Sequence, residues 1–340
     1  SIIRNNVISI QSSNSNQDAF DIGSRSKDIL IEGNTISNAT DKGISIGESS
    51  TAVIRRNTII NCASGVAIKD SSFAEVINNT FFRNDVAINV YEKTSGQGGG
   101  SVVAVNNIFA ECQTNEVRVD EKSNIVVTYS LSNTSELFGV HNIVGDPLFV
   151  DVDNGDFRLM KNSPAIDAGD LASPKDLDET RADIGAHYYD QSPKSFSVVL
   201  NEICPNNETI ISDPAGEFED WLELYNGSDK MFNVAGLYLT DDLGNPSKYQ
   251  IISSEANSTT IPPKGVLIIW LDDDLDQEGL HASFKLNAAG EELGLFYIDA
   301  GDTMQIDAMQ LMRLARTNRL PDYRMGPEIG YYHQIHHPAN

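Results

Sequence analysis

Basic residues and cysteines are scarce in this chain of 340 residues, and it has no long apolar run. It carries 24 Lys and Arg against 49 Asp and Glu, so its formal net charge is −25. Such a chain would repel a polyphosphate, and we therefore expect no nucleic-acid partner. The longest apolar run, Val266–Leu271, falls far short of the ~20 residues that a membrane-spanning helix needs, so we expect no membrane span.

What the chain does contain is enough apolar side chain to form packed cores. Hydrophobic residues make up 40% of the sequence, which argues against a generally disordered chain, and the length corresponds to about two domains. The chain begins at Ser1 inside a repeat, with no initiator Met and no signal peptide in view. We expect it to be a mature or excised piece of a longer protein.

The first half repeats a short pattern in which an asparagine precedes a β-branched residue. The repeated asparagines are Asn6, Asn34, Asn57, Asn79 and Asn107. Successive members are 28, 23, 22 and 28 residues apart, and a second short apolar strand follows each one. Strands of this length and spacing predict the coils of a parallel β-helix. An antiparallel barrel with coincidental asparagine turns is the alternative.

The asparagine column has a physical reason. Asn tolerates left-handed backbone at a sharp corner better than other residues that carry a side chain. Equivalent residues of stacked coils lie about 4.8 Å apart, so their amides can hydrogen-bond along a ladder. Aliphatic residues one strand later should stack in the same way inside the coils. Coil by coil, these are Ile22, Ile46, Ile68, Ile88 and Val119.

The residues that alternate with these aliphatics should face outward along a groove suited to an extended polymer. Coil by coil, they are Asp21, Ser45, Ala67, Ala87 and Arg118. One carboxylate in the column makes a poor site for polysaccharide hydrolysis, which needs two. Asp18 and Asp21 are the weak catalytic candidates, because carboxylates of upstream coils could join them; a solvated edge is the alternative. We expect ordinary surface charges at Asp41, Lys42, Lys69 and Asp70.

The three cysteines predict free thiols. Cys62 and Cys112 each lie five residues after a repeated asparagine, which puts them in one column, two coils apart. That separation is roughly 9–10 Å, beyond the ~7 Å between Cα atoms that a disulfide allows. Cys204 lies in a different region of the chain. We expect buried thiols and no disulfide.

Residues 1–190 resemble the right-handed parallel β-helix of pectate-lyase-like, carbohydrate-associated proteins. The resemblance rests on the asparagine-centred coils and on a closing segment that includes Gly145–Val150, Ser163–Gly169 and Arg181–Ala186. It implies the fold of this half and says little about its activity, because the same scaffold carries lyases, hydrolases, epimerases and inert surface proteins.

After a polar linker over 191–197, longer strands predict an antiparallel, immunoglobulin-like β-sandwich over 198–340. We expect seven strands, at Ser197–Ile203, Asp220–Tyr225, Leu237–Thr240, Tyr249–Ile252, Gly265–Leu271, Ala282–Leu286 and Glu292–Tyr297. Within this half, Leu200–Ile203, Glu217–Asn226 and His281–Glu291 resemble a bacterial lamin-tail domain. The resemblance implies binding or attachment at a bacterial surface, without naming a ligand.

Clusters of carboxylates suggest binding sites for hard cations, and Ca²⁺ is the one cofactor that they suggest. The weak metal candidates are Asp151, Asp153, Asp156, Asp272, Asp274 and Asp276. Solvated acidic loops are the alternative for both clusters. His333, His336 and His337 have a spacing that could ligate zinc or nickel, although a packed or disordered terminus is our preferred interpretation. For His281 we prefer a structural hydrogen bond.

These observations predict an all-β protein, a right-handed parallel β-helix followed by a lamin-tail-like sandwich. We expect an extracellular or cell-surface module that binds a polysaccharide or another surface component within a larger protein. The alternatives are a polysaccharide lyase or glycoside hydrolase, with its site in upstream coils or near Asp21, and a structural surface-layer or adhesin component that self-assembles. We lean against enzymatic activity for this stretch of chain.

Overall fold

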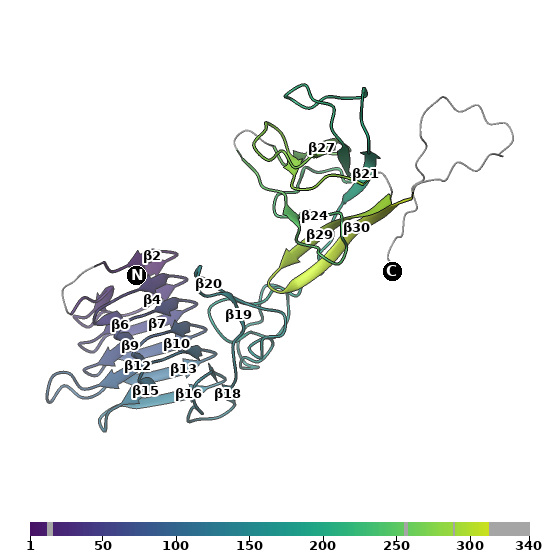
Figure 1. The fold of residues 1–340 in the computed structure, drawn as a ribbon. Coiled ribbons are helices and arrows are strands. Elements are labelled where there is room, and N and C mark those ends of the chain that lie inside the picture. The colour runs from purple at the N-terminus through teal and green to yellow at the C-terminus, as the bar shows by residue number, and fades with distance from the viewer. Residues whose placement is uncertain (12–15, 255–257, 288–289, 313–340) are drawn as a thin grey trace. The chain divides into compact units, whose positions relative to one another are not determined.

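A computed structural model describes residues 1–11, 16–254, 258–287 and 290–312 of the chain (Figure 1). Every regular element in these residues is a β-strand, so none of them forms a helix that could cross a membrane. The chain divides into two compact units, one over Ser1–Ser192 and one that begins at Pro193.

The first unit is a right-handed parallel β-helix made of three sheets, seen in Figure 1 as stacked arrows. All strand pairs within the three sheets are parallel. The first sheet contains β1 (Ile2–Arg4), β4 (Ile29–Glu32), β7 (Thr51–Arg55), β10 (Phe73–Ile77), β13 (Ser101–Val105) and β16 (Asn124–Thr128). The second contains β2 (Val7–Ser9), β5 (Thr35–Ser37), β8 (Thr58–Ile60), β11 (Thr80–Phe82), β14 (Ile108–Ala110), β17 (Leu131–Ser132) and β18 (Ile143–Val144). The third contains β3 (Phe20–Ile22), β6 (Lys42–Ile46), β9 (Ser64–Lys69), β12 (Val86–Tyr91) and β15 (Asn115–Val119).

Inside the coils, apolar side chains stack in continuous columns. Ile31 pairs with Ile54 and Ile54 with Val76 across the first sheet, and all three are fully buried. On the second sheet the rings of Phe81 and Phe109 stack with centroids 5.4 Å apart. Each such side chain contributes about 1.5–3 kcal/mol through burial, so the repeat itself supplies the core.

The asparagine ladder runs along one corner of the coils. The Nδ2 of Asn57 donates to Oδ1 of Asn79 at 3.0 Å, and the Nδ2 of Asn79 donates to Oδ1 of Asn107 at 3.1 Å. The left-handed residue at this corner is not the ladder asparagine but the residue before it, which corrects the explanation given above. From coil to coil that position is held by Asn5, Gly33, Arg56, Asn78 and Asn106. The residue before each ladder asparagine therefore turns the chain, and the asparagine itself forms the amide hydrogen bonds between coils.

The register of the fourth coil differs from the sequence prediction by two residues. Asn89, not Ala87, pairs with Ala67 in the outward column, and Val90, not Ile88, pairs with Ile68 in the inward one. A shift of two residues keeps every side chain on the same face of a strand, so alternation alone cannot distinguish the two registers.

The closing segment packs against the outside of the β-helix. Its hairpin joins β19 (Phe149–Asp151) and β20 (Asp156–Leu159). Beyond the hairpin, the Nδ2 of Asn78 donates to the carbonyl of Asp183 at 2.7 Å, and Oγ1 of Thr80 accepts the N–H of Ala186 at 3.0 Å. Asn78 at a corner and Thr80 at the start of β11 thus hold the closing segment.

The second unit is a sandwich whose core draws on both of its four-stranded sheets, with Leu222 and Ile269 from one and Leu239 and Leu293 from the other. One sheet runs β21 (Val198–Cys204), β22 (Trp221–Asn226), β27 (Val266–Leu271) and β28 (His281–Ala282). The other runs β25 (Tyr249–Gln250), β24 (Tyr238–Thr240), β29 (Gly290–Asp299) and β30 (Asp302–Met312). A smaller sheet pairs β23 (Phe232–Asn233) with β26 (Thr260–Ile261).

Three features of the sandwich differ from the sequence prediction. The small sheet of β23 and β26 was not expected. β28 (His281–Ala282) shares only Ala282 with the expected strand and runs parallel to β27, whereas an antiparallel partner was expected. β30, eleven residues long, was not expected, because its sequence is rich in Met and Gln rather than in β-branched residues. It pairs with β29 through a tight turn at Ala300 and Gly301, both with positive φ.

Candidate functional site

A cleft opens on the β-helix where the strands of the third sheet end. Its volume is about 570 Å³. It is lined by residues 21–25, 47–49, 69–70 and 93–94 and by Gln97. We call it the Lys69 cleft. Three cationic side chains (Arg25, Lys69, Lys93) and three carboxylates (Asp21, Glu48, Asp70) contribute to its lining. Sequence reasoning singled out Asp21, which the structure places here.

One wall of the cleft is a long loop of the fourth coil; at the same corner, the other coils described have shorter connections. It runs from Glu92 to Gly100 and accounts for the wider spacing between Asn79 and Asn107. The buried carboxylate of Asp70 accepts the backbone N–H groups of Lys93 at 2.8 Å and Thr94 at 2.9 Å. The Glu92 carboxylate accepts two further N–H groups of the same loop. Hydrogen bonds to charged acceptors are strong, so the wall is held in place.

A chain of hydrogen bonds crosses the floor of the cleft. The Nζ of Lys69 donates to Oγ of Ser45 at 2.7 Å, and that hydroxyl donates to Oδ1 of Asp21 at 2.8 Å. Lys69 Nζ is also 3.9 Å from the same carboxylate oxygen. Its side chain lies across Gly47, where an added Cβ would stand 2.8 Å from Lys69 Cε. Glycine at this position therefore gives the lysine its path.

A second lysine on the same sheet is paired differently. Lys42 Nζ contacts the carboxylates of Asp41 and Asp18, the latter at 3.5 Å. Burial opposes its charge, yet the hydrogen bond with Asp41 and the nearby charge of Asp18 raise the pKa of Lys42. For Lys69, burial and then the charge of Lys93 lower the pKa, against the attraction of Asp21. The pKa values of the two lysines are thus shifted in opposite directions.

Two titratable groups near Lys42, the Asp18 carboxyl group and the Tyr91 hydroxyl group, also have shifted pKa values. Burial raises the pKa of Asp18, against the attraction of Lys42. Burial also raises the pKa of the Tyr91 hydroxyl.

The expectation of ordinary surface charges is wrong for three residues of this region. Lys42, Lys69 and Asp70 are 5–7% exposed. Lys42 and Lys69 lie on strands with a neighbouring strand of the third sheet on either side, and Asp70 lies beneath the loop whose N–H groups it accepts. The wider spacing between Asn79 and Asn107 was a signal for the loop that walls the cleft, but the first interval is equally wide, so spacing alone did not locate the cleft.

Of the two acidic clusters, the first does not come together as a metal site. Asp151 accepts hydrogen bonds from Asn154 across a turn, and Asp156 pairs with Arg158 at 2.7 Å. Asp153 is exposed. Within the part of the chain that the structure describes, these carboxylates belong to no group of three that could hold an ion.

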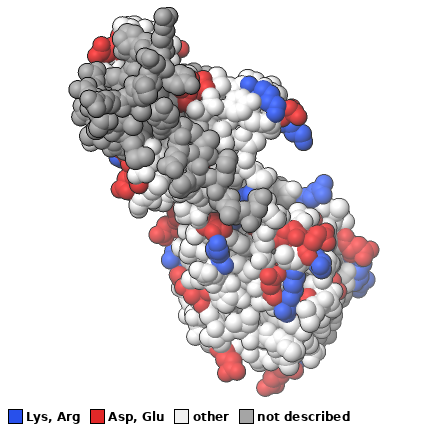
Figure 2. Space-filling view, turned by 90° about the vertical axis from the view of Figure 1, so that its right-hand side faces the viewer, with Lys and Arg blue, Asp and Glu red and all other residues white. Residues whose placement is uncertain are grey.

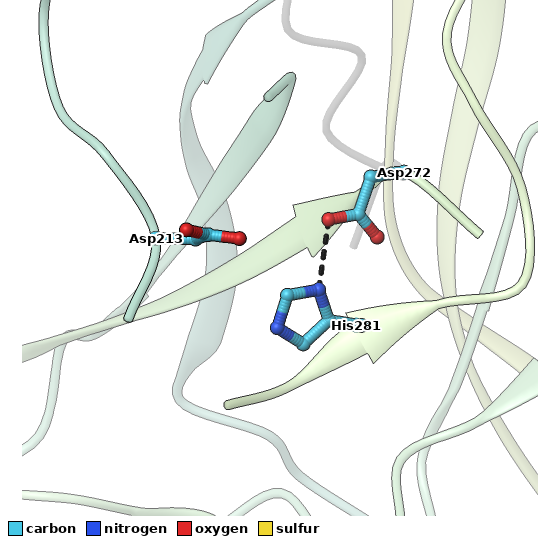
Figure 3. A group of neighbouring side chains, drawn as sticks. All are labelled: Asp213, Asp272 and His281. Atoms are coloured by element: carbon cyan, nitrogen blue, oxygen red, sulfur yellow. Dashed lines mark hydrogen bonds and ion pairs between the residues drawn. The ribbon is translucent and has the colours of Figure 1, made fainter. Parts of the chain in front are cut away.

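The second cluster is divided between two groups in the sandwich. Asp272 lies with Asp213 and His281 (Figure 3), and Asp274 lies with Glu217 and Glu219. In each group the ligand atoms are within 4.8 Å of one another. Asp276 belongs to neither among the residues described. Sequence reasoning missed Asp213, which no local spacing links to the acidic run. His333, His336 and His337 lie outside the described residues.

Charge on the face shown in Figure 2 is mixed. Lys and Arg side chains lie singly or in small groups among Asp and Glu, and this face shows no extended basic surface among the described residues. All three cysteines are free, as expected. Cys62 is buried, but Cys112 and Cys204 are only partly buried, so the expectation of buried thiols is wrong for those two.

Comparison with known proteins supports the fold of the first unit. A family model described as a right handed beta helix region matches residues 1–97. No protein with a curated description matches the chain.

Proposed function

We propose that the β-helix binds a segment of an extended polysaccharide in the Lys69 cleft, outside the cell and within a larger protein. The observation that carries this proposal is the polar lining of the cleft, in which charges of both signs stand among Ser24, Ser49, Thr94 and Gln97. A sugar chain presents hydroxyl groups that both donate and accept hydrogen bonds, and such a lining offers partners for both.

The charges of the cleft favour an acidic sugar. Arg25, Lys69 and Lys93 converge on the cleft of a chain whose formal net charge is −25. Lys69 is close to Asp21 and Ser45, but Lys93 has no salt-bridge partner among the residues that the structure describes. The carboxylate of a uronate residue could form a salt bridge with Lys93. Binding would then weaken as salt rises, because screening acts most strongly on exposed charges.

Binding to a panel of acidic and neutral polysaccharides, measured by calorimetry, tests the proposal. We expect binding to at least one acidic polymer, and a loss of at least about tenfold in affinity, or roughly 1.4 kcal/mol, in Lys93→Ala. Arg83→Ala is the matched control, since Arg83 pairs with Glu111 at a different corner of the coils and should bind as before. No binding to any polymer would contradict the proposal.

A second candidate, a polysaccharide lyase, is favoured by the position of Lys69 in the cleft beside Asp21, where burial and the charge of Lys93 lower the pKa of the amine. A neutral Lys69 amine could take the proton from the carbon that bears the uronate carboxyl group. A carbon–carbon double bond would then form as the neighbouring C–O bond breaks, and the glycosidic oxygen would leave with that electron pair and take a proton from water. Products with an ultraviolet-absorbing double bond, absent in Lys69→Met, would establish this activity. New reducing ends without that absorbance, lost in Asp21→Ala, would indicate hydrolysis instead.

For the second unit we propose a lamin-tail-like attachment role. The support is its sandwich of two four-stranded sheets and the sequence resemblance over Leu200–Ile203, Glu217–Asn226 and His281–Glu291. If this is correct, the chain sediments with bacterial cell envelopes, and Lys93→Ala leaves that association unchanged. Ordered arrays of the pure protein in electron micrographs would indicate an architectural role instead.

A further inference from the structure

We propose that Asp213, Asp272 and His281 form a binding site for a single divalent transition-metal ion of the zinc class in the sandwich. The three side chains come from separate parts of the unit: Asp213 from a loop before β22, Asp272 from the end of β27, and His281 from the start of β28 (Figure 3). All three are at least 96% buried.

One carboxylate oxygen in this group lacks a partner. Oδ1 of Asp213 accepts the N–H of Glu217 at 2.7 Å and closes a turn, whereas Oδ2 is buried and has no hydrogen-bond partner. Figure 3 shows this carboxylate directed toward Asp272 and the imidazole. A buried acceptor without a partner costs about 1–3 kcal/mol, and more when it is charged, so native proteins rarely leave one unpaired. A cation between the three side chains would supply the missing partner.

The other two side chains are already held in position. Oδ1 of Asp272 accepts the N–H of Asp274 at 3.1 Å, and Oδ2 lies 2.8 Å from Nδ1 of His281. Two ligands of a tetrahedral ion stand roughly 3.3–3.6 Å apart when each bond is about 2.0–2.2 Å long. A small outward movement of the ring would therefore admit an ion between them. Nε2 of the His281 ring lies 3.1 Å from the Glu278 carbonyl oxygen. A hydrogen bond to that carbonyl can fix the orientation of the imidazole ring.

Charge balance favours an ion of charge two. Two buried carboxylates carry a charge of −2, and a protonated imidazole would still leave one negative charge uncompensated. A divalent cation bound to a neutral imidazole brings the group to zero, which removes the cost of a buried net charge.

The donor set favours the zinc class over calcium. Ca²⁺ takes six to eight oxygen ligands, whereas imidazole nitrogen with two carboxylates suits Zn²⁺ and its neighbours. A second acidic group, Glu217, Glu219 and Asp274, is more exposed and shares the turns that hold Asp213 and Asp272. It would raise the local concentration of cations at the site.

Metal titration of the full chain tests this site. For this titration we substitute His333→Ala, His336→Ala and His337→Ala, so that those three histidines cannot bind metal. The protein is then treated with a chelator before the metal is added. We expect one equivalent of Zn²⁺ to bind and to raise the melting temperature, with Ca²⁺ doing neither. Asp213→Asn should weaken binding on the order of 100-fold, whereas Asp229→Asn, whose side chain is 92% exposed, should bind as before.

Co²⁺ provides a readout that needs no variant within the site. A visible absorption spectrum of a four- or five-coordinate ion with nitrogen and oxygen ligands supports the proposal, and Zn²⁺ should abolish it. No stoichiometric Zn²⁺, stoichiometric Ca²⁺ in its place, or unchanged affinity in a folded Asp213→Asn protein would each overturn it.

Discussion

The side-chain amide of Asn79 is the fourth of five in a continuous ladder, with its Nδ2 donating to Oδ1 of Asn107 at 3.1 Å. It also donates to the Ile54 carbonyl at 2.9 Å, and its own Oδ1 accepts both the backbone N–H and the Nδ2 of Asn57 at 3.0 Å. One fully buried side chain thus satisfies polar groups on three coils.

Asn79→Ala should therefore lower the free energy of unfolding of the β-helix by about 3 kcal/mol, because several buried polar groups lose their partners at once. Asn6→Ala, at the exposed end of the ladder, should cost about 1 kcal/mol or less. Urea unfolding followed by far-ultraviolet circular dichroism measures both. Both tryptophans, Trp221 and Trp270, lie in the sandwich, so their fluorescence reports that unit separately. Equal losses in the two variants would show that the ladder does not act as a buried network.

The closing segment should make stability depend on pH through Asp183. Burial raises the pKa of this carboxyl to about 6, even though its oxygens accept the N–H groups of Tyr189 and Asp167, both at 2.7 Å. Between about pH 4 and 6 the folded state therefore binds more protons than the unfolded state, whose carboxyl has an ordinary pKa near 3.9. The contribution of Asp183 to stability is accordingly greatest at low pH and falls as pH rises through this window.

Melting temperatures of the wild type and Asp183→Asn at pH 4.5, 5.5 and 6.5 test that contribution. The wild-type value minus the variant value should become smaller as pH rises. This difference cancels other carboxyl groups that titrate over the same range. A difference that stays constant would show that Asp183 is not the responsible group.

Gly47→Ala should weaken polysaccharide binding while leaving the fold intact. The added methyl group would stand 2.8 Å from Lys69 Cε, so the lysine must leave its path to Ser45. We expect a loss of about tenfold in affinity, measured by calorimetry with the polymer that the wild type binds. Gly145→Ala is the control, because its nearest neighbour is a Pro164 carbon at 3.4 Å, an ordinary contact. Unchanged affinity in Gly47→Ala would show that Lys69 does not contribute to polysaccharide binding.

The thiols of the β-helix should resist alkylation. Burial raises the pKa of Cys62 to about 11, and burial with the nearby charge of Glu116 raises that of Cys112 to about 12. Iodoacetamide reacts with the thiolate, so at pH 8 we expect almost no modification of either residue until urea unfolds the chain. Mass spectrometry of peptides measures this. Rapid labelling of Cys62 in the folded protein would contradict its burial within the coils.

Much of the β-helix could be predicted from the sequence, because its contacts are between residues 22–28 positions apart. At that spacing, residues at equivalent positions of successive repeats contact one another. The contacts of Asn57 and of Ile68 could therefore be predicted from the recurrence of asparagine and of aliphatic residues along the sequence. The two-residue ambiguity at Asn89 shows the limit of the method, since alternation identifies the face of a strand and not its register. The sandwich strands followed from β-branched runs, and β30, which has few such residues, was missed.

By itself, the sequence determined the repeat, the asparagine column and the all-β character, since each rests on local spacing and on backbone preference. Only the tertiary structure decided which charges are buried, as for Lys69, and which distant side chains meet, as Asp213 and His281 do across 68 positions of chain. The physical reason is that burial and long-range contact depend on how whole strands and coils stack. No local pattern encodes that stacking.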